Sequence, residues 1–211
     1  MKQLKLKELE LIIQSIPFFR NPDVKLEQYA TPSTLAARIL WIAETVYGDI
    51  HGKAVLDLGS GTGRLGLGAS YMGAQISVLI DIDESAIAEA KKSAEKLGIR
   101  GGVDLVLADA RFLPLREKSF DTVIENPPFG VHRRGADIDF LRSAARVGGI
   151  IYTIHKKSTL SYVKRRAGEF GCRYAKRIYE DKICIPYMFS FHRKRLHCVD
   201  IVVLRLVCQG I

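Results

Sequence analysis

The tetrapeptide Asn126-Pro127-Pro128-Phe129 combines residue types that could activate a weak nitrogen nucleophile. The two prolines stiffen the backbone and lack N–H donors, so the Pro127 carbonyl is a fixed acceptor beside the side-chain oxygen of Asn126. Two such acceptors can take both hydrogens of one –NH2 group, which frees the nitrogen lone pair for attack. Phe129 offers an apolar face on which a flipped base can stack. The pattern therefore predicts chemistry on a planar amino group.

The position of this tetrapeptide along the chain strengthens that interpretation. It directly follows an apolar run at 120–124 that predicts a strand, and ligands bind at the carboxyl edge of such sheets. Glu125 lies between the run and the tetrapeptide, and strand alternation points it to the other face, so we interpret it as structural. A rigid turn with a capping Asn126 is the alternative, but the glycine loop upstream favours the catalytic interpretation.

That glycine loop spans residues 57–63, with the sequence DLGSGTG. It follows an apolar run at 54–58 and precedes a predicted helix, which is the arrangement of a nucleotide-type site. Gly59 and Gly61 allow close backbone approach and positive φ, and the helix start presents unpaired N–H groups. The loop therefore predicts a cofactor cradle rather than an ordinary turn.

Three acidic residues follow at strand ends or helix starts. Asp81 ends the next strand about 20 residues after the loop, where a carboxylate can accept from both ribose hydroxyls. Asp83 is predicted to be the N-cap of the following helix. Asp109, beside Ala110, could accept from an adenine amine, or it could be a turn acid before Pro114.

These features fit either a dinucleotide or S-adenosylmethionine. The match to the dinucleotide fingerprint starts two residues late, at Gly61, whereas a strand-end Asp57 followed by GxGxG resembles the Rossmann-like methyltransferases. A methylsulfonium needs no pyrophosphate cradle but favours nearby carboxylates or carbonyls, which Asp57 and the strand end at Asn126 can provide. S-adenosylmethionine is therefore the expected cofactor.

The elements that must position these residues alternate between strand and helix. This pattern predicts one α/β domain, a Rossmann-like methyltransferase fold with a seven-stranded, mostly parallel sheet. Residues 51–211 form that domain, and residues 1–50 form a helical extension or lid interrupted by prolines. Strands are expected at 54–58, 76–80, 103–107, 120–124, 148–154, 172–179 and 197–207, and helices at 65–72, 83–97, 137–147 and 158–170.

Composition adds charge and redox expectations. The net charge of +9 and a pI near 9.4 suit a phosphate-rich partner. No apolar run approaches the ~18 residues of a membrane span, so no membrane association is expected. The four cysteines stand at wide spacings without a ligand pattern, so we expect reduced thiols in a cytoplasmic protein and no metal site.

With these residues in view, the chain resembles the NPPF-type adenine-N6 methyltransferases. More specifically, it resembles the archaeal–eukaryotic ribosomal RNA adenine-N6 methyltransferase family. The likeness extends over nearly the whole chain: the N-terminal KLKELE helix, QYxTP at 28–32, DLGSGTG, IDIDESA, FDTVIxNPPFG at 120–130, and HKxST at 155–159. The glycine and NPPF motifs are widespread, but their combination with QYxTP and HKxST is much more specific.

The resemblance implies an activity, a site and partners. It implies transfer of a methyl group to the N6 amine of an adenine in small-subunit ribosomal RNA. The residues implied to contact the cofactor are Gln28, Tyr29, Thr31, Asp57, Gly59, Gly61, Gly63, Asp81, Ile82, Asp109, Ala110 and Asn126. Catalysis would involve Asn126, Pro127, Pro128 and Phe129. The family also implies a small zinc-binding activator protein, which would dock on the edge strand Val103–Leu107.

Basic side chains near the predicted site suggest how RNA would be held. The expected contacts are Arg133, Arg134, His155, Lys156, Arg193, Lys194 and Arg195, which would follow phosphates around a flipped base. A solvated basic face is the simpler alternative for some of them. Competing functions are a protein glutamine-N5 methyltransferase, which would favour Tyr at position 129, a small-molecule methyltransferase, and a non-catalytic RNA-binding or ribosome assembly factor.

Overall fold

The protein folds around a single seven-stranded sheet, seen in a computed structural model that describes residues 4–19, 22–29, 31–186 and 196–208. The strand order is β3-β2-β1-β4-β5-β7-β6, and β7 is the strand that runs antiparallel to its neighbours. The strands are β1 (Ala54–Leu58), β2 (Ile76–Asp81), β3 (Val103–Leu107), β4 (Phe120–Glu125), β5 (Gly148–Lys156), β6 (Cys172–Pro186) and β7 (Leu196–Cys208). The predicted Rossmann-like fold and the edge position of β3 are confirmed.

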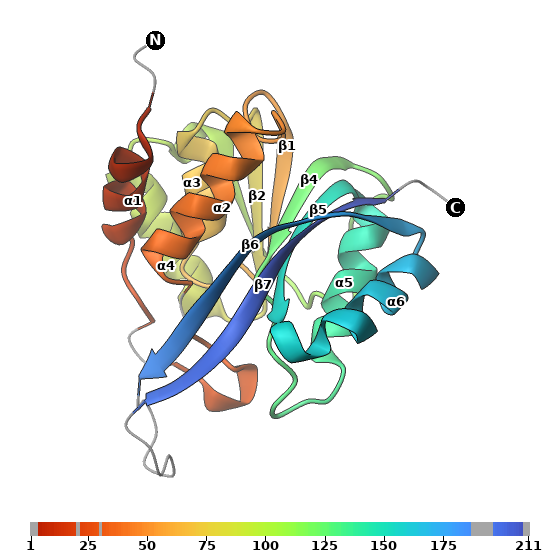
Figure 1. Cartoon of the computed structure of the whole chain (residues 1–211). Helices are drawn as coiled ribbons and strands as arrows, with labels where there is room; N and C mark the ends of the chain where they lie inside the picture. Colours follow the sequence, from red (N-terminus) through yellow and green to blue (C-terminus); the bar gives the residue numbers. More distant parts are fainter. Residues whose placement is uncertain (1–3, 20–21, 30, 187–195, 209–211) are drawn as a thin grey trace.

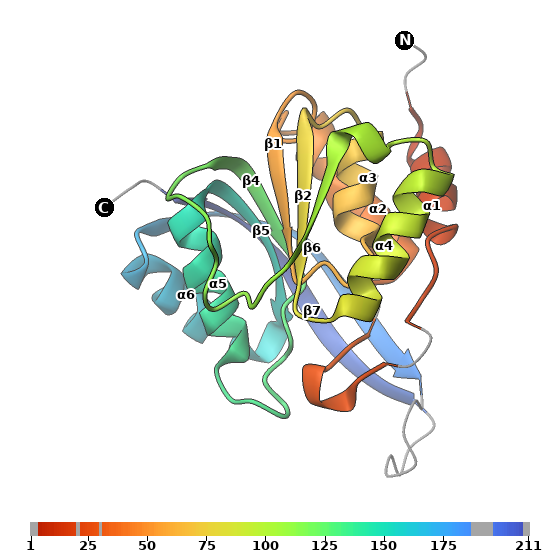
Figure 2. The same cartoon turned by 180° about the vertical axis from the view of Figure 1, so that it is seen from behind.

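Helices cover both faces of this sheet (Figures 1 and 2). The α-helices are α1 (Leu6–Gln14), α2 (Ser33–Thr45), α3 (Arg64–Tyr71), α4 (Glu84–Lys96), α5 (Ala136–Val147) and α6 (Leu160–Glu169), with short 3-10 turns η1 (Val24–Leu26), η2 (Arg100–Gly102) and η3 (Lys157–Thr159). α5 and α6 lie on one face, and α1 to α4 lie on the other. Among these described helices, none is long and apolar enough to span a bilayer.

Alternating side chains along the central strands supply the two cores. Leu56, Leu58 and Val123 pack with α5 and α6, while their neighbours Val55 and Ile124 pack with α1, α2 and α3. Successive strand residues point to opposite faces, so a strand covered on both sides reads as a continuous apolar run. This is why the runs at 54–58 and 120–124 predicted strands.

The N-terminal extension contributes to the second of these cores. Leu9 and Ile13 of α1 and Leu40 of α2 are fully buried against β1, β4, β5 and β7. The chain then crosses the carboxyl end of the sheet through η1, at the bottom of Figure 1. The extension therefore shares its apolar core with the sheet before it reaches the strand ends.

The expectation of reduced thiols is wrong. Cys172 is bonded to Cys208, and Cys184 is bonded to Cys198. β6 and β7 form an antiparallel ribbon that is longer than predicted, and its register places each cysteine directly opposite its partner, with Cα atoms 3.9 and 4.0 Å apart. Spacing along the sequence could not reveal this pairing, because it depends on the register of two strands.

Candidate active site

The glycine loop leaves β1 and turns sharply over the ends of β1 and β2. The Gly59 N–H donates to the Ile80 carbonyl at 2.9 Å, and the Gly61 N–H donates to Asp81 Oδ2 at 2.7 Å. Both glycines have positive φ, and a Cβ at Gly59 would lie 2.6 Å from the Phe140 ring. The loop is therefore a cradle that only glycine backbone can form at these positions.

Asp57 lies beneath this cradle. Its carboxylate is 1% exposed and accepts from the Gly66 N–H at 2.6 Å, which ties β1 to the first turn of α3. Burial raises the pKa of Asp57 to about 7. A carboxylate with a pKa near neutrality in an apolar cavity favours a cationic ligand, because a nearby positive charge stabilises the ionised carboxylate.

The other two predicted acids differ in their partners. Asp81 Oδ1 accepts from the Asp83 N–H at 3.0 Å, and burial raises the pKa of Asp81. Asp109 instead receives hydrogen bonds from the Arg111 side chain, which lower its pKa. Each Asp81 oxygen accepts one hydrogen bond and retains a second lone pair for a ligand, whereas both Asp109 oxygens already accept two bonds from Arg111. Asp83 caps α4 as predicted, accepting from the Ser85 N–H at 2.8 Å.

A segment of the N-terminal extension crosses the cavity, and we call residues 22–29 and 31 the N-terminal strap. Gln28 Nε2 donates to Asp83 Oδ2 at 2.6 Å, while its Oε1 accepts from the Asp23 N–H at 2.7 Å. Glu27 Oε1 accepts from the His132 N–H at 2.8 Å. The strap is thus fixed both to the start of α4 and to the loop after the NPPF tetrapeptide.

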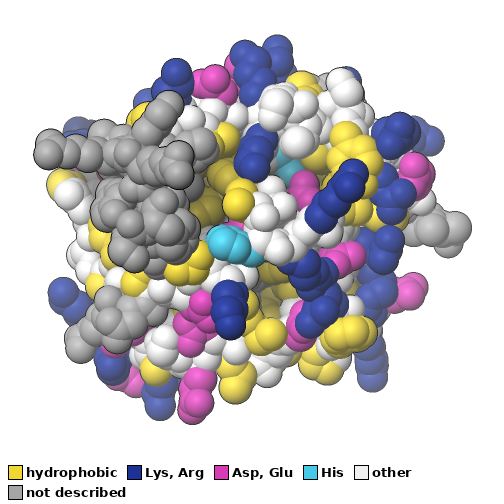
Figure 3. Space-filling model, turned by 90° about the horizontal axis from the view of Figure 1, so that it is seen from below, with side chains coloured by type: hydrophobic (Ala, Val, Ile, Leu, Met, Phe, Trp, Pro, Cys, Tyr) yellow, Lys and Arg dark blue, Asp and Glu magenta, His cyan; other side chains and the backbone are white. Residues whose placement is uncertain are grey.

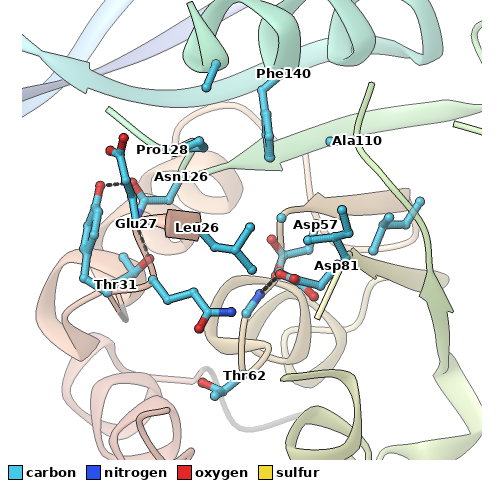
Figure 4. A pocket seen from close by; sticks show the side chains of 18 of the residues that line it. Leu26, Glu27, Thr31, Asp57, Thr62, Asp81, Ala110, Asn126, Pro128 and Phe140 are labelled. Carbon is cyan, nitrogen blue, oxygen red and sulfur yellow. Dashed lines mark hydrogen bonds between the residues drawn. The ribbon is translucent and has the colours of Figure 1, made fainter. Parts of the chain in front are cut away.

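The strap also holds the side chain of Asn126, which follows β4. Asn126 Nδ2 donates to Thr31 Oγ1 at 3.0 Å, and Asn126 Oδ1 accepts from the Tyr29 hydroxyl at 3.2 Å. Figure 4 shows these two hydrogen bonds on one side of the cavity and the Gly61–Asp81 bond on the other. Asn126 therefore faces the same cavity as the glycine loop.

Phe129 lies beside this group rather than along the cavity wall. Its ring is 5.3 Å from that of Tyr29, and the Lys156 ammonium is 5.5 Å from its centre. Glu125 is buried on the opposite side of β4, paired in register with Thr153 of β5. Burial raises the pKa of Glu125 to about 8. The Thr153 side chain acts to lower this pKa, and the nearby charge of Asp137 adds to the increase.

Most of the predicted cofactor residues line one cavity. The residues that do so are Gln28, Tyr29, Thr31, Asp57, Gly59, Gly61, Asp81, Ile82, Asp109, Ala110 and Asn126, together with Pro128 of the tetrapeptide and Arg133. Gly63, Pro127 and Phe129 are not among its lining residues. Gly63 instead forms the N-cap of α3, with a φ of 91°.

Several cavity residues were not predicted. Phe19, Leu26, Glu27, Arg64 and Phe140 also line it. The sequence does contain a signal for Arg64, because it directly follows the glycine loop and lies within an apolar helix. A buried arginine in such a helix needs hydrogen-bonding partners. The others come from segments far apart in the sequence, and no local pattern marks them.

The predicted RNA contacts have different environments. Arg134 is exposed, and Arg133 lies at the cavity and pairs with Asp139. His155 is wrong as an RNA contact, because its side chain is 1% exposed and its Nε2 is hydrogen-bonded to Thr153 Oγ1 at 2.8 Å. Residues 193–195, the basic cluster Arg193-Lys194-Arg195, lie outside the described residues.

Comparisons with known proteins agree with this geometry. The methyltransferase domain family matches residues 50–165. The rRNA N(6)-adenosine-methyltransferase Mettl5 of Drosophila melanogaster is 36% identical over 205 residues, which cover 95% of each chain. The crystal structure of a candidate RNA methyltransferase from Pyrococcus horikoshii superimposes with a TM-score of 0.87 at 34% identity, covering 99% of this chain and 100% of that one. The ribosomal protein L11 methyltransferase of Thermotoga petrophila is 32% identical over only 57% of this chain and 44% of its own.

Proposed function

The chain belongs to the methyltransferase family that includes the rRNA N(6)-adenosine-methyltransferases, and we propose that it methylates the N6 amine of an adenine in small-subunit ribosomal RNA. The observation that carries the proposal is the position of Asn126. Its amide lies at the end of β4, on the same cavity as the glycine loop and Asp81. Asn126, which is suited to bind an amine, therefore lies on the same cavity as the glycine loop and Asp81, which are suited to bind a nucleoside cofactor.

S-adenosylmethionine fits the residues of this cavity. Gly59 and Gly61 leave room that a Cβ would fill, Asp81 is suited to ribose hydroxyls, and Asp57 is suited to a cation. Asp109 and Ala110 would border the adenine. The cofactor, when bound, supplies an electrophilic methyl group on its sulfonium.

Asn126 and Pro127 would activate the substrate amine. Asn126 Oδ1 and the Pro127 carbonyl accept the two amine hydrogens, which moves the nitrogen toward a tetrahedral geometry and frees its lone pair. Held in this way, the nitrogen could accept the methyl group that S-adenosylmethionine would supply, with one amine proton released to water. These acceptors stabilise the positive charge that develops on the nitrogen during transfer.

A basic surface around the cavity supports RNA as the substrate. Arg133, Arg134 and Lys156 lie near the tetrapeptide, and Lys25 and Arg111 border the cavity. Figure 3 looks onto this end of the molecule and shows lysine and arginine side chains spread across it beside apolar ones. Such a surface attracts phosphates, while a flipped base enters the cavity.

The free edge of β3 supports a partner that extends the sheet, which we propose is the small zinc-binding activator. Val106 is half-buried and Leu107 is 55% exposed. Apolar side chains therefore lie beside the edge of β3 that pairs with no other strand among the described residues. Leu107→Asp should abolish activator binding in a pull-down. Leu105 is a poorer test position, because it packs against the core under α4. Retained binding by Leu107→Asp would refute the proposed docking edge.

The activity is tested with labelled S-adenosylmethionine and ribosomal RNA, with and without the activator, followed by digestion to nucleosides. We expect label in N6-methyladenosine and a loss of at least about 100-fold in Asn126→Ala, as for removal of one transition-state hydrogen-bonding group. Label in a protein fraction would favour a glutamine methyltransferase instead. RNA binding without any methyl transfer would favour a non-catalytic factor, and an unaffected Asn126→Ala would refute the role of Asn126.

A further inference from the structure

The amide of Asn126 has two different ends, and only one suits the proposed reaction. Its oxygen must face the substrate amine, because the nitrogen end carries hydrogens and would oppose another donor. In the structure the nitrogen end is occupied by Thr31 Oγ1 at 3.0 Å. The oxygen end faces the Tyr29 hydroxyl at 3.2 Å. Asn126 is therefore held by residues about 95 positions earlier in the chain.

Thr31 is itself held in place by a buried arginine. Arg64 Nη1 donates to the Thr31 carbonyl at 3.0 Å, and Arg64 Nη2 donates to the Ile16 carbonyl at 2.8 Å. The guanidinium is 4% exposed with its carbon 4.1 Å from the centre of the Phe18 ring. A guanidinium fixed by several acceptors and an aromatic face has little freedom to move. A continuous set of contacts thus runs from the end of α1 through Arg64 and Thr31 to Asn126.

We propose that Thr31 is a positioning residue that sets the amide of Asn126 with its oxygen toward the reacting amine. This inference rests on the proposed role of Asn126. Thr31 is 8% exposed, so its hydroxyl is shielded from water that could replace it. Without that hydroxyl, the amide would rotate about its last side-chain bond and present its hydrogens to the amine in part of the population. The N-terminal extension would then contribute to catalysis without supplying a catalytic residue.

The test compares Thr31→Val, which removes the hydroxyl at nearly constant shape, with Thr31→Ser, which keeps it. In the full-length protein, Thr31→Val should lower kcat about 10–100-fold, as expected for a misplaced hydrogen-bonding group. Thr31→Ser should restore kcat to within about threefold of the wild type. Because Thr31 also lines the cofactor cavity, kcat is measured with S-adenosylmethionine at saturation for each variant. Thr34→Val, at an exposed position in the first turn of α2, is the matched control.

A second measurement follows the amide directly and needs no turnover. The side-chain NH2 resonances of Asn126, assigned by their absence in Asn126→Asp, should shift and exchange with solvent about tenfold faster in Thr31→Val but not in Thr31→Ser. Unchanged resonances, equal loss of kcat in the Val and Ser variants, or a kcat loss explained by weaker cofactor binding would overturn the proposal. No label in N6-methyladenosine from the wild type would refute the proposed function, and a fully active Asn126→Ala would refute the roles of Asn126 and Thr31. Activity lost in Asn126→Ala but kept in Thr31→Val refutes only the role of Thr31.

Discussion

Gln28 donates a 2.6 Å hydrogen bond to Asp83, the residue that caps α4, across 55 positions of sequence. The same side chain accepts from the Asp23 N–H, so one amide closes the turn of the strap and fastens it to the sheet. Although Gln28 was predicted to contact the cofactor, both ends of its amide are bonded to protein. Its effect on cofactor binding therefore depends on how firmly the strap covers the cavity.

Replacing Gln28 with Glu tests that dependence. The glutamate keeps an oxygen that accepts from the Asp23 N–H, but it replaces the amide nitrogen that donates to Asp83 with a negatively charged oxygen. We expect the dissociation constant for S-adenosylmethionine to rise about tenfold, since a hydrogen bond to a charged group is exchanged for repulsion. Isothermal titration calorimetry measures the change. Gln14→Glu, on the exposed side of α1, adds the same charge and should leave the affinity unchanged. Equal effects of the two variants would mean that charge alone matters.

The pKa of Asp57 predicts how cofactor affinity depends on pH. Because burial raises this pKa to about 7, Asp57 is largely protonated at pH 6 and must lose its proton to stabilise a sulfonium. The affinity for S-adenosylmethionine should therefore increase about tenfold between pH 6 and pH 8, with proton release on binding. S-adenosylhomocysteine, which is uncharged at sulfur, should show a much weaker dependence.

The matched variant is Asp57→Asn, which retains an oxygen to accept from the Gly66 N–H. It should remove the difference in pH dependence between the two ligands. Both ligands carry the same amino and carboxyl groups, so titration of those groups cancels in the comparison. A common slope for the two ligands in the wild type would show that Asp57 does not sense the sulfonium.

The parts of the site that could be predicted from the sequence are those encoded locally. A strand, a glycine loop and a helix in succession place Gly59 and Gly61 at the carboxyl end of the sheet, whatever path the rest of the chain takes. The end of β4 places Asn126 at the same edge. The contacts of Thr31 with Asn126 and Arg64 depend instead on how the extension crosses the sheet. No periodicity encodes that path, although the family resemblance did point to the strap.

His155 shows how a boundary error becomes a functional error. The predicted strand ended at Ile154, which would have left His155 in a loop near the RNA. β5 instead continues to Lys156, because β7 pairs with it as far as Ile201. His155 is therefore inside the sheet, where Thr153 and Asp137 surround it, and only the pairing of a strand some 50 residues later determines this.

The disulfide between Cys184 and Cys198 should stabilise the ribbon of β6 and β7. It closes a segment with a sequence separation of 14, and a loop of this length contributes about 3 kcal/mol in the chain-entropy account. The double variant Cys184→Ser/Cys198→Ser should lose about that much free energy of unfolding in denaturant titrations without reductant. Reductant also opens Cys172–Cys208, so both proteins are measured in it, and the wild type should then match the variant. A difference that persists under these conditions would show that the serines perturb the ribbon in another way.

Glu125 predicts a distinct pH dependence of stability. Its pKa is raised to about 8 in the folded protein, against 4.5 for an ordinary glutamate, so the folded state binds a proton that the unfolded state releases. Its neutral form stabilises the fold at low pH, and that contribution is lost as the pH rises from about 4.5 through 8. The wild type should therefore melt at a lower temperature at pH 9 than at pH 6.

Glu125→Gln keeps the shape of the side chain and cannot ionise. It should reduce the fall in melting temperature between pH 6 and pH 9, with each kcal/mol corresponding to about 2–4 °C for a chain of this size. Differential scanning calorimetry gives both values, and Glu95→Gln, on the exposed face of α4, serves as the control. Part of the slope should remain in Glu125→Gln, because the raised pKa of Asp57 acts in the same direction. If the variant and the wild type lose stability in parallel, Glu125 is already ionised in the folded protein at neutral pH and must have a stabilising partner in the sheet.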